Sequence, residues 1–145
     1  MIRRMREADI GQVMFIENTS FIQPWTYQTF KTELNNPRTV LDVITHGGGI
    51  VAYSGYNVLP DAYDITKIAV ITAYRGRGFG EALINNIISE ARKNSVRKVI
   101  LEVGGRNAPA QKLYEKYGFR RVGLRKKYYE NGDDAILMEW NDKEL

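Results

Sequence analysis

Two spacings of apolar residues run through the chain, and each predicts one kind of element. In five segments, apolar residues fill short runs or take every second position, which is typical of β-strands. These expected strands are Ile2–Met5, Thr39–Thr45, Gly49–Leu59, Ala62–Ile71 and Lys98–Val103. Only three residues, His46 to Gly48, separate the second from the third, which predicts an antiparallel hairpin. From Phe119 onward we expect two more strands around a turn that contains Asn131–Asp134.

Elsewhere apolar residues recur at spacings of three and four, which predicts amphipathic helices. The clearest helix starts at Phe79 and carries Leu83, Ile84, Ile87, Ile88 and Ala91 on one face. We expect Asp9 to help start another, which turns Ile10, Val13, Met14 and Ile16 toward the core. A helix over Tyr27–Leu34 and a last one that ends at the C-cap glycine Gly118 complete the set.

The order of these elements is β-α-α-β-β-β-α-β-α-β-β. This order predicts an α/β fold, with a mixed, mostly antiparallel central sheet and helices on both faces. The chain has 145 residues, about the length of one domain, so we expect a single domain over residues 1–145.

Composition narrows the class of protein. Hydrophobic residues make up 43% of the chain and charged residues 26%, which is ordinary for a globular protein. No apolar run approaches the roughly 20 residues of a membrane span, and no apolar stretch follows the N-terminal arginines. We therefore expect a cytoplasmic protein without a membrane partner.

The chain has no cysteine and one histidine, and both counts exclude kinds of site. Without cysteine there is no disulfide, no thiolate nucleophile and no cysteine-based zinc site. His46 lies beside three glycines, where we expect a solvated turn residue, and one ligand does not make a metal site. A Ser-His-Asp hydrolase is disfavoured because no GxSxG elbow occurs. We therefore predict no metal.

Three glycines alternate with other residues in Arg75–Gly80, RGRGFG, where the helix at Phe79 begins. Glycine adopts positive φ readily and lets a backbone approach a ligand closely. Amides at a helix N-terminus, with the helix dipole, favour an anion. The loop therefore predicts a phosphate site. The net charge of +4 could favour phosphate-bearing ligands or acidic partners.

Two well-known phosphate loops fit this segment poorly. The Walker pattern requires Lys and then Ser or Thr after its last glycine, where this chain has Glu81 and Ala82. The dinucleotide fingerprint requires glycine at the position of Glu81 and a later acid that binds ribose. The segment instead resembles the loop Q/R-x-x-G-x-G/A, with which the GNAT acyltransferase superfamily binds the pyrophosphate of acetyl-CoA.

Within that superfamily the chain looks most like the ribosomal-protein-alanine N-acetyltransferases and their archaeal protein N-terminal acetyltransferase relatives. The resemblance covers nearly the full length. The family segments LEVRxSNxxAxxLYxxxGF, R-x-x-Y-Y and E-D-A-x-x-M correspond to Leu101–Phe119, Arg125–Tyr129 and Asp133–Met138, and the pair Pro24 and Trp25 also has a counterpart. The chain departs from the family at Gly104, Arg106 and Asp133, where the family carries Arg, Ser and Glu. We expect the first two changes to affect peptide preference more than the reaction.

The resemblance implies that acetyl-CoA is the co-substrate. It places the pyrophosphate at Arg75, Gly76, Arg77, Gly78, Phe79 and Gly80. It also implies that the strand end Ile68, Ala69 and Val70 offers backbone amides that polarise the thioester carbonyl. We expect Asn107 to cap the helix that follows it and, by resemblance, to contact the cofactor.

Two residues are candidates for proton transfer. Glu102 lies at the end of an apolar strand, where partial burial would raise its pKa, and the resemblance assigns it the role of base. Tyr114 lies one helical turn before Gly118, the family's position for the acid that protonates the sulfur of CoA. Trp25, Tyr128 and Tyr129 are the expected peptide-binding aromatics, although a tyrosine pair in a strand is often simply packed in the core.

The acidity of the amine favours one class of acceptor. An α-amino group has a pKa of about 7.7 to 8.0 and a lysine about 10.4. At pH 7 deprotonation therefore costs about 1 kcal/mol for the first and about 4.6 kcal/mol for the second, at roughly 1.36 kcal/mol per pKa unit. We therefore predict acetyl transfer to protein or peptide N-termini. Direct attack in a ternary complex is expected, because no cysteine can carry an acyl group.

Other interpretations stay open. The closest is a GNAT acetyltransferase that acts on lysine or on a small-molecule amine, and another is a non-catalytic CoA-binding sensor. A nucleic-acid-binding module would use Arg120, Arg121, Arg125, Lys126 and Lys127, although we expect no nucleic acid to be required. That basic run is more often a solvated strand face, or it attracts an acidic peptide or the 3′-phosphate of CoA. We expect a monomer or a weak homodimer, while the accepted N-terminal residues and any role of a ribosome stay open.

Overall fold

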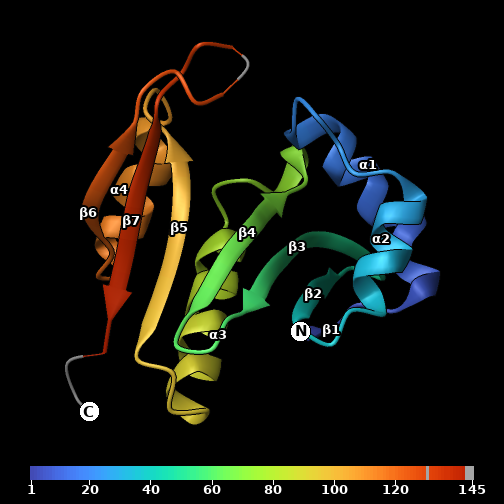
Figure 1. Cartoon of the computed structure of the whole chain (residues 1–145). Helices are drawn as coiled ribbons and strands as arrows, with labels where there is room; N and C mark the ends of the chain where they lie inside the picture. Colours follow the sequence, from blue (N-terminus) through green and yellow to red (C-terminus); the bar gives the residue numbers. More distant parts are fainter. Residues whose placement is uncertain (130, 143–145) are drawn as a thin grey trace. The chain divides into compact units, whose positions relative to one another are not determined.

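The structure is a computed structural model that describes residues 1–129 and 131–142 (Figure 1). Its strands and α-helices follow in the predicted order. The strands are β1 (Ile2–Arg4), β2 (Thr39–His46), β3 (Gly49–Val58), β4 (Tyr63–Val70), β5 (Lys98–Gly104), β6 (Arg120–Arg125) and β7 (Ala135–Asn141). The α-helices are α1 (Ile10–Ser20), α2 (Tyr27–Leu34), α3 (Phe79–Lys93) and α4 (Ala108–Lys116), with short 3-10 helices at Glu7–Asp9 and Thr72–Tyr74.

The strands form one seven-stranded sheet in the order β1-β2-β3-β4-β5-β7-β6. The pairs β1–β2, β2–β3, β5–β7 and β6–β7 are antiparallel, whereas β4 runs parallel to β5 through Tyr63–Ile65. The predicted mixed, mostly antiparallel α/β fold is therefore confirmed. No helix in the described part of the chain is both long and apolar enough to cross a membrane.

The chain forms two compact units. The first consists of Met1–Val58 and Thr66–Leu83, and the second of Leu59–Ile65 together with the residues from Ile84 onward. Both β4 and α3 contribute residues to each unit. The expectation of a single domain over residues 1–145 stays a prediction.

In the first unit, helices cover both faces of the β2–β3 hairpin. Val43 of β2 packs in a cluster with Val13 of α1 and Phe30 of α2. The next residue, Ile44, belongs to a second cluster with Leu83 of α3. Because successive strand residues point to opposite faces, the two clusters lie on opposite sides of the hairpin. Figure 1 shows α1 and α2 side by side on the face of the hairpin that carries Val43.

In the second unit, α4 packs against the strands β5, β7 and β6 (Figure 1). Nε2 of Gln111 in α4 donates to the carbonyls of Gly104 and Gly105, at 2.8 and 3.0 Å. Gly118 ends the helix with φ +95°, and the amide of Phe119 donates to the carbonyl of Tyr114 at 3.1 Å. The predicted C-cap glycine is therefore confirmed.

Asp9 does not start α1 in the expected way. Its carboxylate accepts hydrogen bonds from the amide of Arg6, at 2.8 Å, and from Nη1 of Arg3, at 2.7 Å. The hydrogen bond from Arg3 is the main cause that lowers the pKa of Asp9. Asp9 therefore stabilises the 3-10 helix in front of α1 and ties it to β1, while α1 begins at Ile10 without a side-chain cap.

Candidate active site

The glycine loop of the first unit has the backbone shape that its sequence predicts. Gly76 and Gly78 have φ of +79° and +88°, directly before α3 begins at Phe79. A Cβ atom on Gly76 would meet no atom within 4 Å, so the backbone angle rather than lack of space requires glycine there. The amide of Ala82 donates to the carbonyl of Gly78 at 3.0 Å. The amides ahead of Ala82 belong to the helix end, where the helix itself offers no acceptors.

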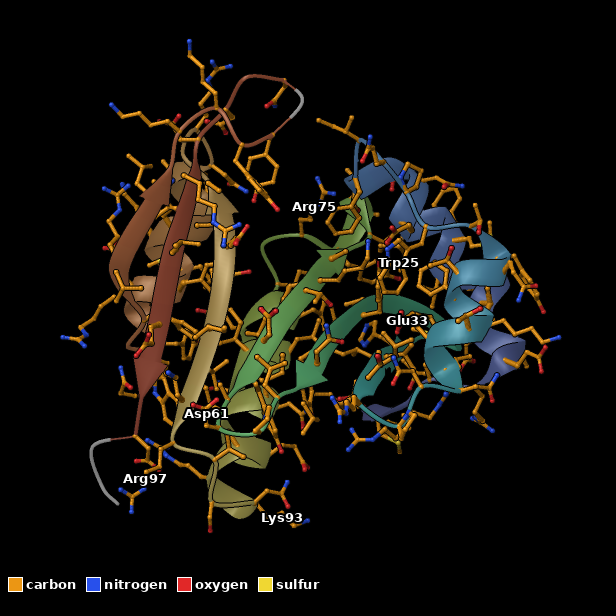
Figure 2. All side chains as sticks on the ribbon, in the orientation of Figure 1. Trp25, Glu33, Asp61, Arg75, Lys93 and Arg97 are labelled. Atoms are coloured by element: carbon orange, nitrogen blue, oxygen red, sulfur yellow. The ribbon has the colours of Figure 1, made fainter. Side chains whose placement is uncertain are left out.

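Arg75 ties this loop to the end of β4. Its Nε donates to the carbonyl of Val70 at 3.0 Å. The next amide, that of Ile71, donates to the carbonyl of Val51 at 2.8 Å. The peptide group between Val70 and Ile71, at the end of β4, is therefore hydrogen-bonded both to Arg75 of the loop and to β3. Figure 2 labels Arg75 beyond the end of β4.

The residues before the loop alternate between the two faces of β4. Ala69 is buried in the cluster beneath α1 and α2. Ile68 and Val70 are half-buried and pack in the other cluster, which also holds Phe79. The strand end is therefore fixed by packing on both sides, as a site that relies on backbone groups requires.

His46 contacts the aromatic residues around the glycine loop. The residue is exposed, as expected, but it is the last residue of β2 rather than part of the turn. Its ring centroid lies 5.6 Å from that of Tyr74 and 5.4 Å from that of Phe79. The guanidinium of Arg77 lies 4.9 Å from the ring centroid of Tyr74. The ring of Tyr74 therefore helps to hold the side chain of Arg77 next to the glycine loop.

Trp25 lies in the segment that joins α1 to α2 and is labelled in Figure 2. It is half-buried, with its ring centroid 5.2 Å from that of Phe30. Its amide donates to Oε2 of Glu17 at 2.7 Å. Nζ of Lys67 lies 4.4 Å from the ring centroid. Both the backbone and the ring of Trp25 are therefore held in place.

In the second unit, Glu102 projects from β5 with its side chain 32% exposed. Nη2 of Arg125 lies 3.7 Å from its Oε1. Asp64 pairs with Ile100 across the β4–β5 ladder and so shares a sheet face with Glu102. Burial, and then the charge of Glu102, raise the pKa of Asp64. Glu102 therefore has a cation and a second carboxyl group as neighbours.

Tyr114 is half-buried in α4, with its ring centroid 5.6 Å from that of Phe119. Burial, and then the neighbouring Tyr129, raise the pKa of Tyr114 to about 12. The phenol is therefore protonated at neutral pH, which is the state that a hydrogen-bond or proton donor requires.

Tyr128 and Tyr129 do not lie in a strand, because β6 ends at Arg125 and β7 begins at Ala135. The alternative in which the pair is packed in the core is wrong for Tyr128, which is 53% exposed. The two ring centroids are 5.4 Å apart, at 76°. Burial, and then Glu102, raise the pKa of Tyr129. Tyr129 is therefore close enough to Glu102 for the charge of the carboxylate to disfavour ionisation of its phenol.

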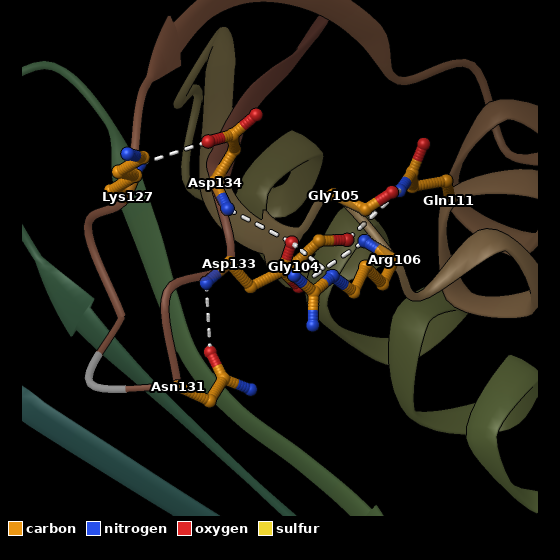
Figure 3. Close-up of polar contacts among 8 residues, drawn as sticks. All are labelled: Gly104, Gly105, Arg106, Gln111, Lys127, Asn131, Asp133 and Asp134. Atoms are coloured by element: carbon orange, nitrogen blue, oxygen red, sulfur yellow. Dashed lines mark hydrogen bonds and ion pairs between the residues drawn. The ribbon is translucent and has the colours of Figure 1, made fainter.

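Asn107 caps α4 as predicted, since its Oδ1 accepts from the amide of Ala110 at 3.3 Å. The three departures from the family pattern lie together just before this cap (Figure 3). Oδ2 of Asp133 accepts from the amide of Arg106 at 3.2 Å, and a Cβ atom on Gly104 would lie 2.8 Å from the same oxygen. Glycine at position 104 therefore makes room for the carboxylate of Asp133.

A hollow of about 640 Å³ opens beside this network, with Arg106, Arg121 and Lys127 on its walls. Asp133 and Asp134 also line it. The amide of Lys127 donates to Oδ1 of Asp134 at 2.9 Å, which holds the β6–β7 connection against this wall (Figure 3). Neither predicted catalytic residue is among the described residues that line the hollow.

Sequence reasoning missed a cluster of charged residues inside the first unit. Glu17 is fully buried and accepts hydrogen bonds from Lys67 and from the hydroxyl of Tyr53. Two signals could have revealed it. Glu17 lies four residues after Val13, on the apolar face of α1, and Lys67 lies in phase with the buried Ala69 of β4.

Across residues 1–129 and 131–142, no three His, Asp or Glu side chains group to hold a metal ion.

Comparison with known proteins places the chain in a family. The model of the acetyltransferase (GNAT) family matches residues 10–119. A Bacillus subtilis protein, provisionally named ribosomal protein bS18-alanine N-acetyltransferase, is 40% identical over 139 residues, which cover 94% of this chain and 92% of that protein. The Mycobacterium tuberculosis protein N-alpha-acetyltransferase RimI is 35% identical over 144 residues, which cover 94% and 89%.

A solved structure extends the similarity to three dimensions. The crystal structure of the ribosomal-protein-S18-alanine N-acetyltransferase from Escherichia coli matches with a TM-score of 0.89 and 30% identity. The match covers 100% of this chain and 97% of that one. With a family match over most of its length and relatives similar from end to end, the chain belongs to the acetyltransferase (GNAT) family.

Proposed function

We propose that this protein transfers an acetyl group from acetyl-CoA to the N-terminal α-amino group of protein substrates. The observation that carries the proposal is the positive φ of Gly76 and Gly78 at the start of α3. A loop of this shape directs backbone amides at an anion such as a pyrophosphate. The name of the Mycobacterium relative supports the α-amino group, and that of the Escherichia coli enzyme supports ribosomal proteins among the substrates.

Acetyl-CoA supplies the activated acetyl group, and the glycine loop binds its pyrophosphate. The amides of Gly76, Gly78 and Gly80 are the principal donors. Arg75, Arg77, Phe79 and Asn107 are the other proposed contacts. The amide of Val70, next to Ile68 and Ala69, donates to the carbonyl oxygen on which negative charge develops. The hydrogen bond from Nε of Arg75 to the carbonyl of Val70 supports this role, because it limits rotation of that strand end.

Glu102 is the base that accepts the proton of the attacking amine. Its side chain is 32% exposed, so an amine can reach it without displacing packed residues. A single carboxylate suffices for an α-amino group, because at pH 7 only about 1 kcal/mol is needed to deprotonate that amine. A lysine would need about 4.6 kcal/mol. The amine attacks the thioester directly, in agreement with a chain that has no cysteine to carry an acyl group.

Tyr114 donates a hydrogen bond to the departing sulfur. Its pKa of about 12 keeps the proton on the phenol until charge develops on the sulfur. A thiol has a pKa of about 8.5, so complete proton transfer from Tyr114 would be uphill by about 5 kcal/mol, at roughly 1.36 kcal/mol per unit. Tyr114 therefore stabilises the thiolate by a strong hydrogen bond, and the proton can then come from solvent.

Trp25, Tyr128 and Tyr129 bind the first residues of the peptide. Trp25 and Tyr129 are half-buried and Tyr128 is exposed, so all three retain some accessible ring surface. Aromatic rings of this kind bind an N-terminal residue and exclude water at little cost in side-chain entropy.

Short peptides that contain one internal lysine test this function, in matched forms with a free and a blocked N-terminus. Mass spectrometry should find the acetyl group on the α-amine of the free form, and no product from the blocked form. Acetylation of only the lysine would overturn the N-terminal assignment and favour the lysine or small-amine alternative. A mixed-sequence peptide pool then defines which first residues are accepted.

A further inference from the structure

We infer that Glu17 and Lys67 are positioning residues that fix Trp25 for peptide binding. The inference rests on the proposed function, because it takes Trp25 as part of the peptide site. Glu17 of α1 is 0% exposed and Lys67 of β4 is 8% exposed. Charges at such depth persist only where hydrogen bonds and a counter-charge compensate the loss of water. Both conditions are met here.

The carboxylate of Glu17 collects three donors. Nζ of Lys67 donates to Oε2 at 2.6 Å, and the hydroxyl of Tyr53 donates to Oε1. The third donor is the backbone amide of Trp25, 2.7 Å from Oε2. One buried oxygen therefore joins the backbone of Trp25 to the ammonium of Lys67.

Lys67 also contacts the aromatic rings of the α1–α2 connection. Its Nζ lies 4.2 Å from the ring centroid of Phe21 and 4.4 Å from that of Trp25. A cation at this distance from a ring centroid is attracted to the ring, and the attraction is stronger where water is excluded. Glu17 therefore holds the backbone of Trp25, whereas Lys67 holds its ring.

A merely stabilising role accounts less well for this arrangement. A buried ion pair contributes no more to stability than apolar side chains of similar volume, and it often contributes less. In this protein Glu17 accepts a hydrogen bond from the backbone of Trp25, and the charge of Lys67 lies next to its ring. The hydrogen bonds of Glu17 join it to Trp25, Tyr53 and Lys67 rather than to the glycine loop. We therefore expect loss of the pair to weaken peptide binding while the glycine loop continues to bind CoA.

The test replaces the pair with neutral side chains of similar size, Glu17→Gln together with Lys67→Met. Glutamine still offers an oxygen to the amide of Trp25. The control is Arg3→Met with Asp9→Asn, which removes an ion pair of 2.7 Å in the same unit. The carboxylate of Asp9 accepts hydrogen bonds from Arg3 and Arg6 rather than from Trp25. For each variant we would measure kcat and KM with a peptide that has a free N-terminal alanine, CoA affinity by calorimetry, and the midpoint of denaturation.

The neutral pair should raise the KM for the peptide by at least about fivefold and leave kcat and CoA affinity within about twofold. Trp25→Ala should raise KM as well, and combining it with the neutral pair should add less than about twofold, because both act through one ring. The control should shift the denaturation midpoint and leave KM within about twofold.

A folded neutral-pair variant with the KM of the unmodified protein would overturn the inference, as would effects that multiply with those of Trp25→Ala. If the neutral pair does not fold, Glu17→Gln alone, which keeps Lys67 and one of the two acceptor oxygens, is judged by the same criteria. Failure of the proposed function is distinguishable, because the unmodified protein would then acetylate no free N-terminus.

Discussion

Nη2 of Arg125 lies 3.7 Å from Oε1 of Glu102, and the two side chains remain 54% and 32% exposed. Ion pairs at such exposed positions contribute about 0 to 1 kcal/mol to stability. The contact therefore places a cation beside the proposed base without making the fold depend on it. It also shows that the basic run Arg120–Lys127 is not only a solvated face, as Arg121 likewise donates to Gln111 at 2.8 Å.

Glu102→Gln should lower kcat by at least about tenfold, because the variant can no longer accept a proton from the amine. CoA affinity should stay within about twofold, and the free energy of unfolding within about 1 kcal/mol, because the lost ion pair is exposed. Steady-state kinetics, calorimetry and urea denaturation measure the three quantities. Glu115→Gln, an exposed carboxylate on α4, is the control and should change none of them. An unchanged kcat for the Glu102 variant would contradict its role as base.

Tyr114→Phe should lower kcat by at least about tenfold, through loss of the hydrogen bond to the departing sulfur. Because the pKa of Tyr114 is about 12, its phenol keeps its proton as the pH rises from 8 to 10. The pH–rate profiles of the unmodified protein and the variant should therefore have the same alkaline shape up to pH 10. A fall in rate near pH 10 that only the unmodified protein shows would mean that Tyr114 ionises near its ordinary value.

Gly76→Ala and Gly48→Ala form a matched pair. Both glycines have similar positive φ, +79° and +83°, and neither would place a Cβ within 4 Å of another atom. Each substitution should therefore cost about 1 to 2 kcal/mol of stability, as alanine is strained at such angles. Only Gly76→Ala should weaken CoA binding, which calorimetry would measure. Equal loss of CoA affinity in both variants would argue against a cofactor role for the loop.

Gly104→Ala should lower the free energy of unfolding by about 1 to 3 kcal/mol, the usual cost of forcing an atom into a packed site. The new Cβ would lie 2.8 Å from Oδ2 of Asp133, whose carboxylate is held by the amides of Arg106 and Asp134. Gly11→Ala, in α1 with no atom within 4 Å, should instead raise stability by about 1 kcal/mol. Urea denaturation compares the two, and a neutral Gly104→Ala would mean that Asp133 moves easily.

Asp64→Asn should raise stability at neutral pH. Burial and the charge of Glu102 raise the pKa of Asp64 in the folded state, so its ionised form is disfavoured there. Such a group lowers stability as pH rises through its unfolded and then its folded pKa, and it costs nothing below both. The advantage of the variant should therefore shrink as pH falls through the raised pKa of folded Asp64 and disappear below about 4, the ordinary range for aspartate. An advantage that is the same at pH 3 and pH 7 would contradict this account.

Most of the secondary structure could be predicted because it depends on neighbours in the chain. The spacing of Leu83, Ile84 and Ile87 is enough to indicate α3, and Gly118 ends α4 through its own backbone freedom. The ends of strands were less certain: β4 ends at Val70, one residue before the prediction. Strand ends depend on hydrogen bonds to other strands, which the local pattern does not contain.

The candidate site likewise contains some features that local sequence predicts and others that it does not. The loop Arg75–Gly80 and the cap Asn107 were predictable, since each needs only particular residues at short spacing. The position of Tyr128 and Tyr129 outside any strand was not predictable, because tyrosine is common in strands. Only the ladder between β6 and β7 shows which residues pair.

The sequence by itself determined the order of the elements and the glycine-rich loop, because these follow from residue type and local spacing, whereas the proposed roles of Glu102 and Tyr114 came from the resemblance to the family. Only the tertiary structure decided that Glu17 and Lys67 meet beneath Trp25, at a separation of 50 residues, and that Asp133 occupies the space left by Gly104. Burial and partnership depend on segments that are distant in the chain and come together only when the chain folds.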